Sequence, residues 1–258
     1  MKTRTTKEQL AVFLSYTNYV NLVNIKKLEF IFNSINKFAL QNKTRLNKLE
    51  ILEVACGNGG ITFPLGSLGC NVRAFDINER VVLFVKARLA QTGLKNIIVS
   101  KEDGNSFEDG KYYDIVIASE VLEHVPDPFR FISNLSKRMK RGSYLVITVP
   151  NGFGPWELVN QFFEPLFHSN TLRHALGKTP HKHIPGEAHI QFFKKSKLIA
   201  LLSQLSFDLV DFSNSDSFFA VCWHFIKPDK AIEKIDMVIA DHFPHWCASG
   251  WYMLLIKT

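Results

Sequence analysis

The sequence predicts an α/β fold in which seven mostly parallel strands form one doubly wound sheet, with an N-terminal helical arm and an inserted lid. Apolar β-type runs alternate with helical stretches between residues 49 and 148, which is typical of a parallel sheet covered by helices on both faces. The first strand runs directly into the turn Gly57-Asn58-Gly59-Gly60, and the second strand ends at Asp76. A strand, a glycine turn and an acid on the next strand are the parts of a nucleoside site in such folds.

The elements follow in order along the chain. Residues 6–41 carry apolar side chains at steps of three and four, which predicts helix, and we take residues 1–45 as the arm. The remaining domain, 46–258, has predicted helices at 60–68, 78–92, 128–139 and 194–206, and its predicted strands are 49–55, 71–75, 97–100, 114–118, 143–148, 207–211 and 251–257.

Residues 151–193 break this alternation, and we expect them to form a lid beside the ligand crevice. They contain glycine, proline, several histidines and an amphipathic piece with the aromatic residues Trp156, Phe162, Phe163 and Phe167. That piece could enclose an apolar substrate or touch a membrane surface. Packing of its apolar face on the domain is the ordinary alternative.

Composition and charge limit the classes of partner. The chain has 258 residues, 46% of them hydrophobic, as in a folded globular protein. Its excess of positive charge lies in the first 50 residues, where nine Lys or Arg stand against three Glu. Such an arm could touch RNA or anionic lipid. However, the lysines are dispersed without an Arg-rich block, which favours a solvated helix and makes nucleic acid an unlikely partner.

Cysteine usage and the N-terminal sequence predict a cytoplasmic protein. The four cysteines, Cys56, Cys70, Cys222 and Cys247, form no Cys-x-x-Cys pair, so a zinc site is not expected and a reducing compartment is. The first residues lack the apolar core of a secretory signal. No apolar run approaches the length that spans a bilayer.

The order of short motifs resembles the class I S-adenosylmethionine-dependent methyltransferases. The segment Glu53-Val54-Ala55-Cys56-Gly57-Asn58-Gly59 is similar to the first motif of that family. Phe75-Asp76-Ile77 is similar to its ribose-binding strand, and Glu102-Asp103-Gly104 to its adenine loop. Residues 113–125, which contain Leu122-Glu123-His124-Val125, resemble a branch that includes ubiquinone-biosynthesis O-methyltransferases. Val149-Pro150-Asn151 and His189-Ile190-Gln191-Phe192-Phe193 are similar to later segments of the same branch.

The resemblance implies the Rossmann-like methyltransferase fold, S-adenosylmethionine as cofactor, and methyl transfer. It assigns cofactor contacts to Glu53, Ala55, Gly57, Gly59, Asp76, Ile77, Asp103, Gly104, Ser119 and Glu120. Glu53 suits the ammonium group of the cofactor and Asp76 its ribose hydroxyls. The alternatives are structural: Glu53 capping amides of the turn, Asp76 capping a helix, Asp103 forming an Asx-turn, and Ile77 as plain core.

Glu120, Glu123 and His124 stand just after the predicted fourth strand. Their spacing is similar to that of the ubiquinone-pathway enzymes, in which the corresponding residues are associated with a divalent metal. A metal would bind a catechol-like diol and lower its pKa. The alternative is a set of buried, hydrogen-bonded groups around the cofactor loop. His124 and His189 are the candidate bases, because an oxygen nucleophile must lose its proton near neutral pH.

We therefore expect methyl transfer to an oxygen of a small-molecule or lipid-linked acceptor, with peripheral membrane contact as an option. Three alternatives stay open: a cofactor-binding protein without turnover, an RNA methyltransferase that uses the basic arm, and a nicotinamide-dependent oxidoreductase. The third is disfavoured because the third glycine of the dinucleotide fingerprint is absent after Gly59. The acceptor and the oligomeric state have no readable signal in the sequence.

Overall fold

A computed structural model of the chain describes residues 5–17, 22–155, 189–216 and 230–258. Seven strands form one sheet in the order β3-β2-β1-β4-β5-β7-β6. Neighbours are parallel except β7, which is antiparallel to both β5 and β6. This confirms the predicted fold class. The strands are β1 (Glu50–Val54), β2 (Asn71–Asp76), β3 (Ile97–Lys101), β4 (Tyr113–Ser119), β5 (Met139–Pro150), β6 (Phe207–Asn214) and β7 (Gly250–Lys257).

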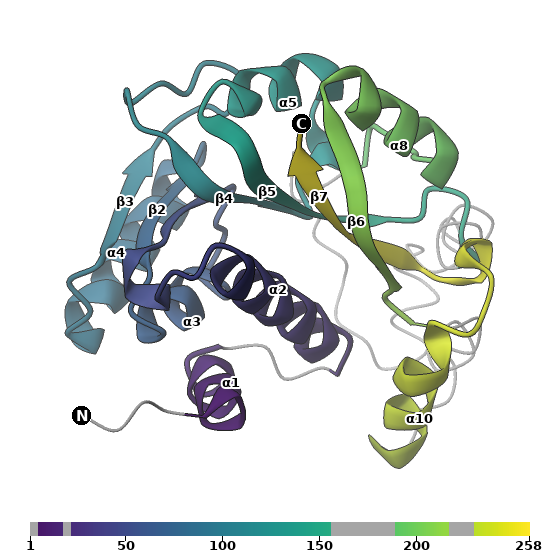
Figure 1. Ribbon diagram of the computed structural model, residues 1–258, viewed down its shortest axis with the longest axis horizontal. Coiled ribbons are helices and arrows are strands. Elements are labelled where there is room, and N and C mark those ends of the chain that lie inside the picture. The colour runs from purple at the N-terminus through teal and green to yellow at the C-terminus, as the bar shows by residue number, and fades with distance from the viewer. Residues whose placement is uncertain (1–4, 18–21, 156–188, 217–229) are drawn as a thin grey trace, which may run out of the picture.

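Helices cover both faces of the sheet, as Figure 1 shows. On one face, α2 (Leu22–Gln41), α3 (Thr62–Ser67) and α4 (Glu79–Thr92) share a core with strand residues such as Ile51 and Ile115. On the other face, α5 (Pro128–Ser136) and α8 (Lys195–Gln204) share a second core with Leu52 and Val116. Successive residues of one strand thus enter opposite cores, as the pleat of a strand requires.

The N-terminal region forms two helices, whereas the sequence predicted one helical run over 6–41. The first, α1 (Thr6–Ser15), begins with a capping box between Thr5 and Glu8 and ends at Tyr16. Tyr and Thr are weaker helix formers than Leu or Lys. The hydroxyl of Thr17 instead donates a hydrogen bond to the carbonyl of Gly60, at 3.0 Å. The division of the chain at residue 45 stays a prediction, although α2 packs into the same core as the sheet.

The strand order reverses beside β1, and this locates the ligand crevice. The chain runs from β1 outward to β2 and β3, and then crosses back to place β4 on the other side of β1. In open α/β sheets, ligands bind outside the carboxyl ends of the strands at such a switch point. Ala55 follows β1 and Glu120 follows β4, and both have left-handed backbone, with φ of 54° and 50°. Two non-glycine residues with this strained conformation therefore stand side by side at the crevice.

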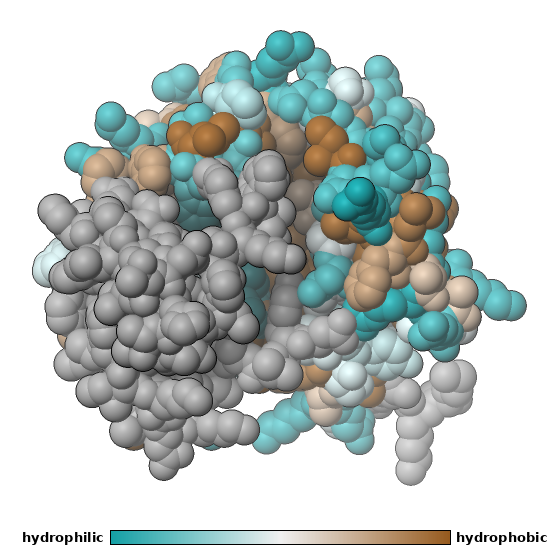
Figure 2. Space-filling view, turned by 180° about the vertical axis from the view of Figure 1, so that it is seen from behind, coloured by the Kyte–Doolittle hydropathy of each residue, from teal (hydrophilic) through white to brown (hydrophobic). Residues whose placement is uncertain are grey.

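Three further features complete the fold. A helix that the sequence analysis did not predict, α10 (Lys230–Ala240), precedes β7. On the face seen in Figure 2, hydrophobic side chains form separate spots within a mostly hydrophilic surface, which is ordinary for a folded protein. Within the described ranges, we find no helix with the length and apolar character that a bilayer crossing requires. Most of the predicted lid, including its aromatic piece, lies outside the described residues.

Candidate active site

The glycine turn after β1 is tightly packed on one side and open on the other. Gly57 and Gly59 both have positive φ, 49° and 80°. A Cβ on Gly59 would lie 2.6 Å from the ring of Phe63, so only glycine fits there. A Cβ on Gly57 would meet no atom within 4 Å in the part of the chain that the structure describes. The open side of Gly57 is thus the place where a ligand can approach the backbone.

Arg88 of α4 holds this turn from the side, and sequence reasoning missed it. Its guanidinium donates a hydrogen bond to the carbonyl of Asn58 at 2.9 Å. It also lies 4.4 Å from the ring centroid of Phe63, a cation–π distance. The side chain of Asn58 accepts a hydrogen bond from the amide of Gly60 at 3.1 Å. The turn is therefore held by contacts with Arg88 of α4 and by a hydrogen bond within the turn itself.

Asp76 lies at the end of β2 and joins the turn to the next helix. One carboxylate oxygen accepts from the amide of Gly57 at 3.1 Å, and the other from the amide of Asn78 at 2.9 Å. The residue is 9% exposed. The helix cap is Asn78, whose side chain accepts from the amide of Arg80. Because a carboxylate offers about four lone-pair positions, Asp76 retains capacity for two ribose hydroxyls.

Glu53, on β1, is a buried carboxyl with a neutral partner. Its Oε2 accepts from the hydroxyl of Thr62 at 2.6 Å, and the residue is 3% exposed. Burial, with a smaller contribution from the charge of Asp76, raises the pKa of Glu53 to about 8. A buried carboxylate is costly unless a cation compensates it. An ammonium group in the crevice would provide that compensation.

The loop after β3 carries the residues that the resemblance assigns to adenine. Asp103 accepts from both the backbone amide and the side-chain amide of Asn105, each at 2.9 Å, which is an Asx-type turn. Gly104 is pressed against the next layer, since a Cβ there would lie 2.3 Å from the ring of Phe131. Ile77 is 65% exposed at the crevice edge, so it is not part of the core.

The end of β4 is tied to β5 and to α2. The amide of Glu120 donates to the carbonyl of Thr148 at 2.9 Å, and its carboxylate accepts from the Thr148 hydroxyl at 2.7 Å. The Ser119 hydroxyl lies 2.8 Å from the same Thr148 oxygen. The ammonium of Lys27, on α2, lies 3.8 Å from Oε1 of Glu120. The hydrogen bonds and the ion pair of Ser119 and Glu120 thus fix the end of β4 against β5 and α2.

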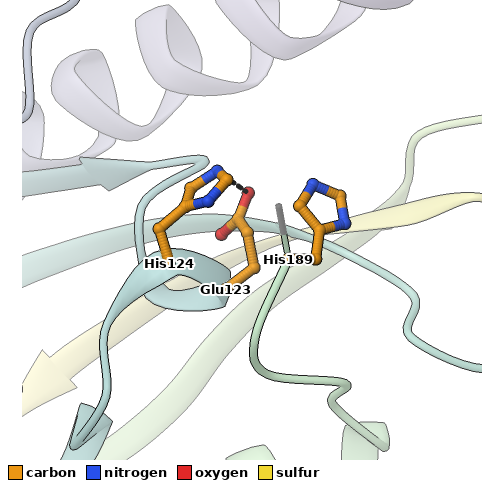
Figure 3. A group of neighbouring side chains, drawn as sticks. All are labelled: Glu123, His124 and His189. Atoms are coloured by element: carbon orange, nitrogen blue, oxygen red, sulfur yellow. Dashed lines mark ion pairs between the residues drawn. The ribbon is translucent and has the colours of Figure 1, made fainter. Parts of the chain in front are cut away.

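Two histidines and a buried glutamate form a compact group, shown in Figure 3. The potential ligand atoms of Glu123, His124 and His189 all lie within 4.8 Å of one another. The imidazole rings are 5.2 Å apart, and Nε2 of His124 lies 4.0 Å from Oε1 of Glu123. The amides of Ile190 and Gln191 donate to the carbonyl of Glu123 at 2.9 and 3.0 Å. These two bonds bring His189 to His124, although 65 residues separate them in the chain.

Glu123 itself is an unusual carboxyl. It is 1% exposed, and its Oε2 has no hydrogen-bond partner among the described residues. Burial, followed by the negative charge of Glu120, raises the pKa of Glu123. Glu120 lies outside the group that could hold a metal and faces Thr148 and Lys27 instead. The three ligand candidates that the structure brings together are therefore not the three that the sequence predicted.

A cavity of about 300 Å³ adjoins this group, and most of its described lining residues are polar or charged. It lies between the start of α2, the end of β5 and the start of β7, and Glu120 and His189 form part of its wall. Its described lining residues are Asn24, Lys27, Glu120, Val149, Pro150, His189, Ser215, Asp216, Ser249, Gly250 and Tyr252. The volume is at the lower end of the range for small-molecule sites.

Comparison with known proteins gives one family. A sequence model described as a methyltransferase domain matches residues 22–211. The ubiquinone biosynthesis O-methyltransferase of Rickettsia akari (strain Hartford) is 35% identical over 130 residues, 50% of this chain and 50% of that protein. The enzyme of the same name from Aliivibrio fischeri (strain MJ11) is 24% identical over 168 residues, 65% of this chain and 67% of that one. The chain spans about half the length of the Rickettsia relatives that it matches.

Solved structures show the same fold. Magnesium protoporphyrin IX methyltransferase from Synechocystis PCC 6803, with bound S-adenosylhomocysteine, superposes with a TM-score of 0.55 at 17% identity, covering 98% of this chain and 95% of that one. A methyltransferase from Aquifex aeolicus superposes with a TM-score of 0.53 at 12% identity, covering 99% and 100%. The family match covers most of the chain and includes the turn, Asp76 and the end of β4. The chain therefore belongs to the class I S-adenosylmethionine-dependent methyltransferase family.

Proposed function

We propose that this enzyme methylates an oxygen atom of a small-molecule or lipid-linked acceptor, which binds in the cavity beside Glu120. The observation that carries the proposal is the position of His189. It lines the cavity and also belongs to the group with Glu123 and His124. A histidine at the wall of the acceptor cavity suits an oxygen nucleophile, which must lose a proton before it attacks. The relatives named ubiquinone biosynthesis O-methyltransferase support an oxygen acceptor.

In this proposal each part of the cofactor contacts a different set of crevice residues. The open side of Gly57 receives the methionyl chain, Glu53 accepts from its ammonium group, and Asp76 accepts from the ribose hydroxyls. Ile77 and Asp103 border the adenine, and Ser119 and Glu120 close the crevice on the acceptor side. When bound, S-adenosylmethionine supplies an electrophilic methyl carbon on a positively charged sulfur. The buried carboxyl of Glu53 fits this cofactor, because its partner Thr62 is neutral and a cation is needed to compensate its charge.

His189 and His124 are the proposed proton-handling residues. His189 accepts the proton from the acceptor hydroxyl. His124, whose ring lies 5.2 Å from that of His189, gives the proton a route toward Glu123 and solvent. Replacing His189 with alanine should abolish transfer to catechol acceptors while S-adenosylhomocysteine binds with unchanged affinity. Transfer at the wild-type rate would remove His189 as the base.

Glu123, His124 and His189 are also candidate ligands for a divalent cation. One carboxylate and two imidazoles suit zinc or manganese. A cation with bonds of about 2.1 Å would need the ligand atoms considerably closer together than the 4.8 Å within which they lie. It would lower the pKa of a bound hydroxyl. If a metal acts here, exhaustive chelation stops turnover without affecting S-adenosylhomocysteine binding. Full turnover after chelation would show that no metal takes part in the reaction, and His124 and His189 would remain as the proposed proton-handling residues.

The test of the cofactor assignment is calorimetry with S-adenosylhomocysteine. Asp76→Asn should weaken binding about 100-fold, because two hydrogen bonds to a charged acceptor contribute about 1.5–3 kcal/mol each and the amide retains only part of them. Asp114→Asn is the matched control. Asp114 also accepts from a backbone amide, that of Glu50 at 3.0 Å, but it stands near the start of β4, at the end of the strands opposite the crevice. Equal affinities of the two variants would overturn the ribose assignment.

A further inference from the structure

A second cavity of about 300 Å³ lies at the end of the sheet opposite the crevice. Its walls come from the first residues of β1, β2 and β4 and from the segment that leads into β3. The described lining residues are Glu50, Asn71, Val72, Arg73, Lys95, Asn96, Ile98, Lys111 and Tyr113. Because the crevice lies at the carboxyl ends of these strands, this cavity is separate from the candidate active site.

One face of the sheet is uncovered at β2 and β3, where this cavity lies. Parallel strands are usually connected by a helix that covers the sheet, but residues 102–112, which join β3 to β4, form turns and irregular chain without a helix. Arg73 and Ile98 pair in register. They alternate with Val72 and Ile97, which enter the core shared with α3 and α4. Ile98 thus points to the other face, where it is 56% exposed.

Three cations line the cavity against one carboxylate. The side chain of Arg73 is 19% exposed, and its guanidinium pairs with Oε1 of Glu102 at 3.3 Å. That contact uses one of the five N–H donors of an arginine. Lys95 and Lys111 are exposed, and neither forms an ion pair with a carboxylate in the part of the chain that the structure describes.

The carboxylates near the cavity are bound to neutral donors. Glu50 accepts from the side-chain amide of Asn71 at 2.7 Å. Asp109 accepts from the hydroxyl of Tyr113 and from the backbone amide of Lys111. These hydrogen bonds hold both acids without placing them against the lysine ammonium groups. The cavity therefore combines an excess of positive charge with an exposed apolar side chain.

We propose that this cavity binds a small phosphate monoester with an apolar body. Such a phosphate carries about −1.5 to −2 charges at pH 7 and has three acceptor oxygens, which matches three cations better than a single carboxylate would. Arg73 holds the phosphate, because a guanidinium can bind it through two parallel N–H···O bonds. Lys95 and Lys111 add charge at the rim, and the apolar body covers Ile98. This site is independent of the proposed methyl transfer.

Phenyl phosphate is the probe, because it joins a phosphate monoester to an apolar ring. Isothermal calorimetry uses the full chain at low salt, which limits screening of the charges. The wild type should bind phenyl phosphate about ten-fold or more tightly than inorganic phosphate. Arg73→Gln should weaken binding of the probe by roughly ten-fold or more, since hydrogen bonds to a charged group are lost. Ile98→Glu places a negative charge beside the phosphate and should abolish binding.

Two matched variants control for charge and for surface changes elsewhere. Lys140 is an exposed cation that lies over the ring of Tyr112, 5.3 Å from its centroid, and it does not line the cavity. Leu83 is 60% exposed on α4 and so matches Ile98 in exposure. Lys140→Gln and Leu83→Glu should both bind phenyl phosphate as the wild type does. Thermal unfolding checks that each variant is folded.

A variant with both Lys95→Gln and Lys111→Gln changes only exposed side chains, so it tests the site even if Arg73→Gln does not fold. It should bind phenyl phosphate several-fold more weakly. Wild-type affinity in this double variant or in folded Arg73→Gln would overturn the inference. So would absence of binding to the wild type, or equal affinities for phenyl phosphate and inorganic phosphate. Displacement of the probe by S-adenosylhomocysteine would place it in the crevice instead and reject this site.

Discussion

The open side of Gly57 allows a sharp test of where the cofactor lies. In Gly57→Ala, the new methyl group meets no atom of the described residues within 4 Å. The remaining cost to the protein is the left-handed backbone, with φ of 49°, which a non-glycine residue adopts at about 1–2 kcal/mol. Part of that cost is offset because alanine has less conformational freedom than glycine in the unfolded chain. We expect the free energy of unfolding to fall by about 1 kcal/mol.

The effect on the ligand should be larger than the effect on the fold. A cofactor that lies against Gly57 must share its space with the added methyl group. Forcing one methyl group into a packed contact costs about 1–3 kcal/mol, which corresponds to roughly a 5- to 150-fold weaker Kd. Isothermal calorimetry with S-adenosylhomocysteine measures this directly.

Gly93→Ala is the control for the backbone cost. Gly93 caps the end of α4 with φ of 69°, and a Cβ there also meets no described residue within 4 Å. Urea unfolding should show a similar loss of stability for both variants, while only Gly57→Ala loses affinity. If Gly57→Ala binds S-adenosylhomocysteine as tightly as Gly93→Ala does, the ligand does not approach this turn, and the crevice assignment is wrong.

Three other predictions concern the same site. The pKa of Glu53 is raised from 4.5 to about 8, so the folded protein keeps a proton that the unfolded chain releases. The stability that the protonated Glu53 contributes is present below about pH 4.5 and disappears as the pH rises to 8. In urea unfolding, Glu53→Gln should reduce this decline in the free energy of unfolding, and an unchanged pH profile would contradict the raised pKa of Glu53. Arg88→Met removes the bond to Asn58 and the contact with Phe63, and should weaken S-adenosylhomocysteine binding several-fold by loosening the turn; the exposed Arg80→Met is the control, and equal affinities would show that the turn needs no clamp. Gly104→Ala places a Cβ 2.3 Å from the ring of Phe131 and should destabilise the protein by about 1–3 kcal/mol, with partial recovery in the double variant with Phe131→Leu; additive effects in thermal unfolding would argue against this contact.

The central strands could be predicted because each is a short apolar run with clear ends. The expected strand over 71–75 is β2, which ends one residue later at Asp76. The sequence was less informative where burial is partial. The sequence analysis also missed α10, on which Ile235 and Val238 are 59% and 64% exposed whereas Asp236 is buried. β5 begins at Met139, before the expected start at 143, because Met139 pairs with Tyr113 across an irregular register.

Some residues of the site are placed by their spacing in the sequence, and others only by tertiary contacts. Glu53, Gly57 and Gly59 occupy one strand and its turn, so their spacing in the sequence already places them together. Lys27 and Arg88 come from helices, and nothing in helical periodicity says that one reaches the end of β4 and the other the glycine turn. His189 is brought to His124 by hydrogen bonds of the residues that follow it: the amides of Ile190 and Gln191 donate to the carbonyl of Glu123, and the side chain of Gln191 donates to the carbonyl of Pro126. Tertiary contacts of this kind have no signature in a single sequence.

The strained residues Ala55 and Glu120 turn the chain at the ends of β1 and β4, where local sequence and tertiary contacts meet. The left-handed conformation costs each of them about 1–2 kcal/mol. A backbone hydrogen bond to a neighbouring strand offsets this cost at each position. The amide of Cys56, which follows Ala55, donates to the carbonyl of Phe75, and the amide of Glu120 donates to the carbonyl of Thr148. At Ala55 the chain turns so that the next amide, that of Gly57, reaches Asp76. At Glu120 it turns the carboxylate toward Thr148 and Lys27. The turn at Ala55 forms the proposed cofactor side of the crevice, and the turn at Glu120 forms the proposed acceptor side. Because β1 and β4 pair directly, cofactor and acceptor would meet at one switch point of the sheet.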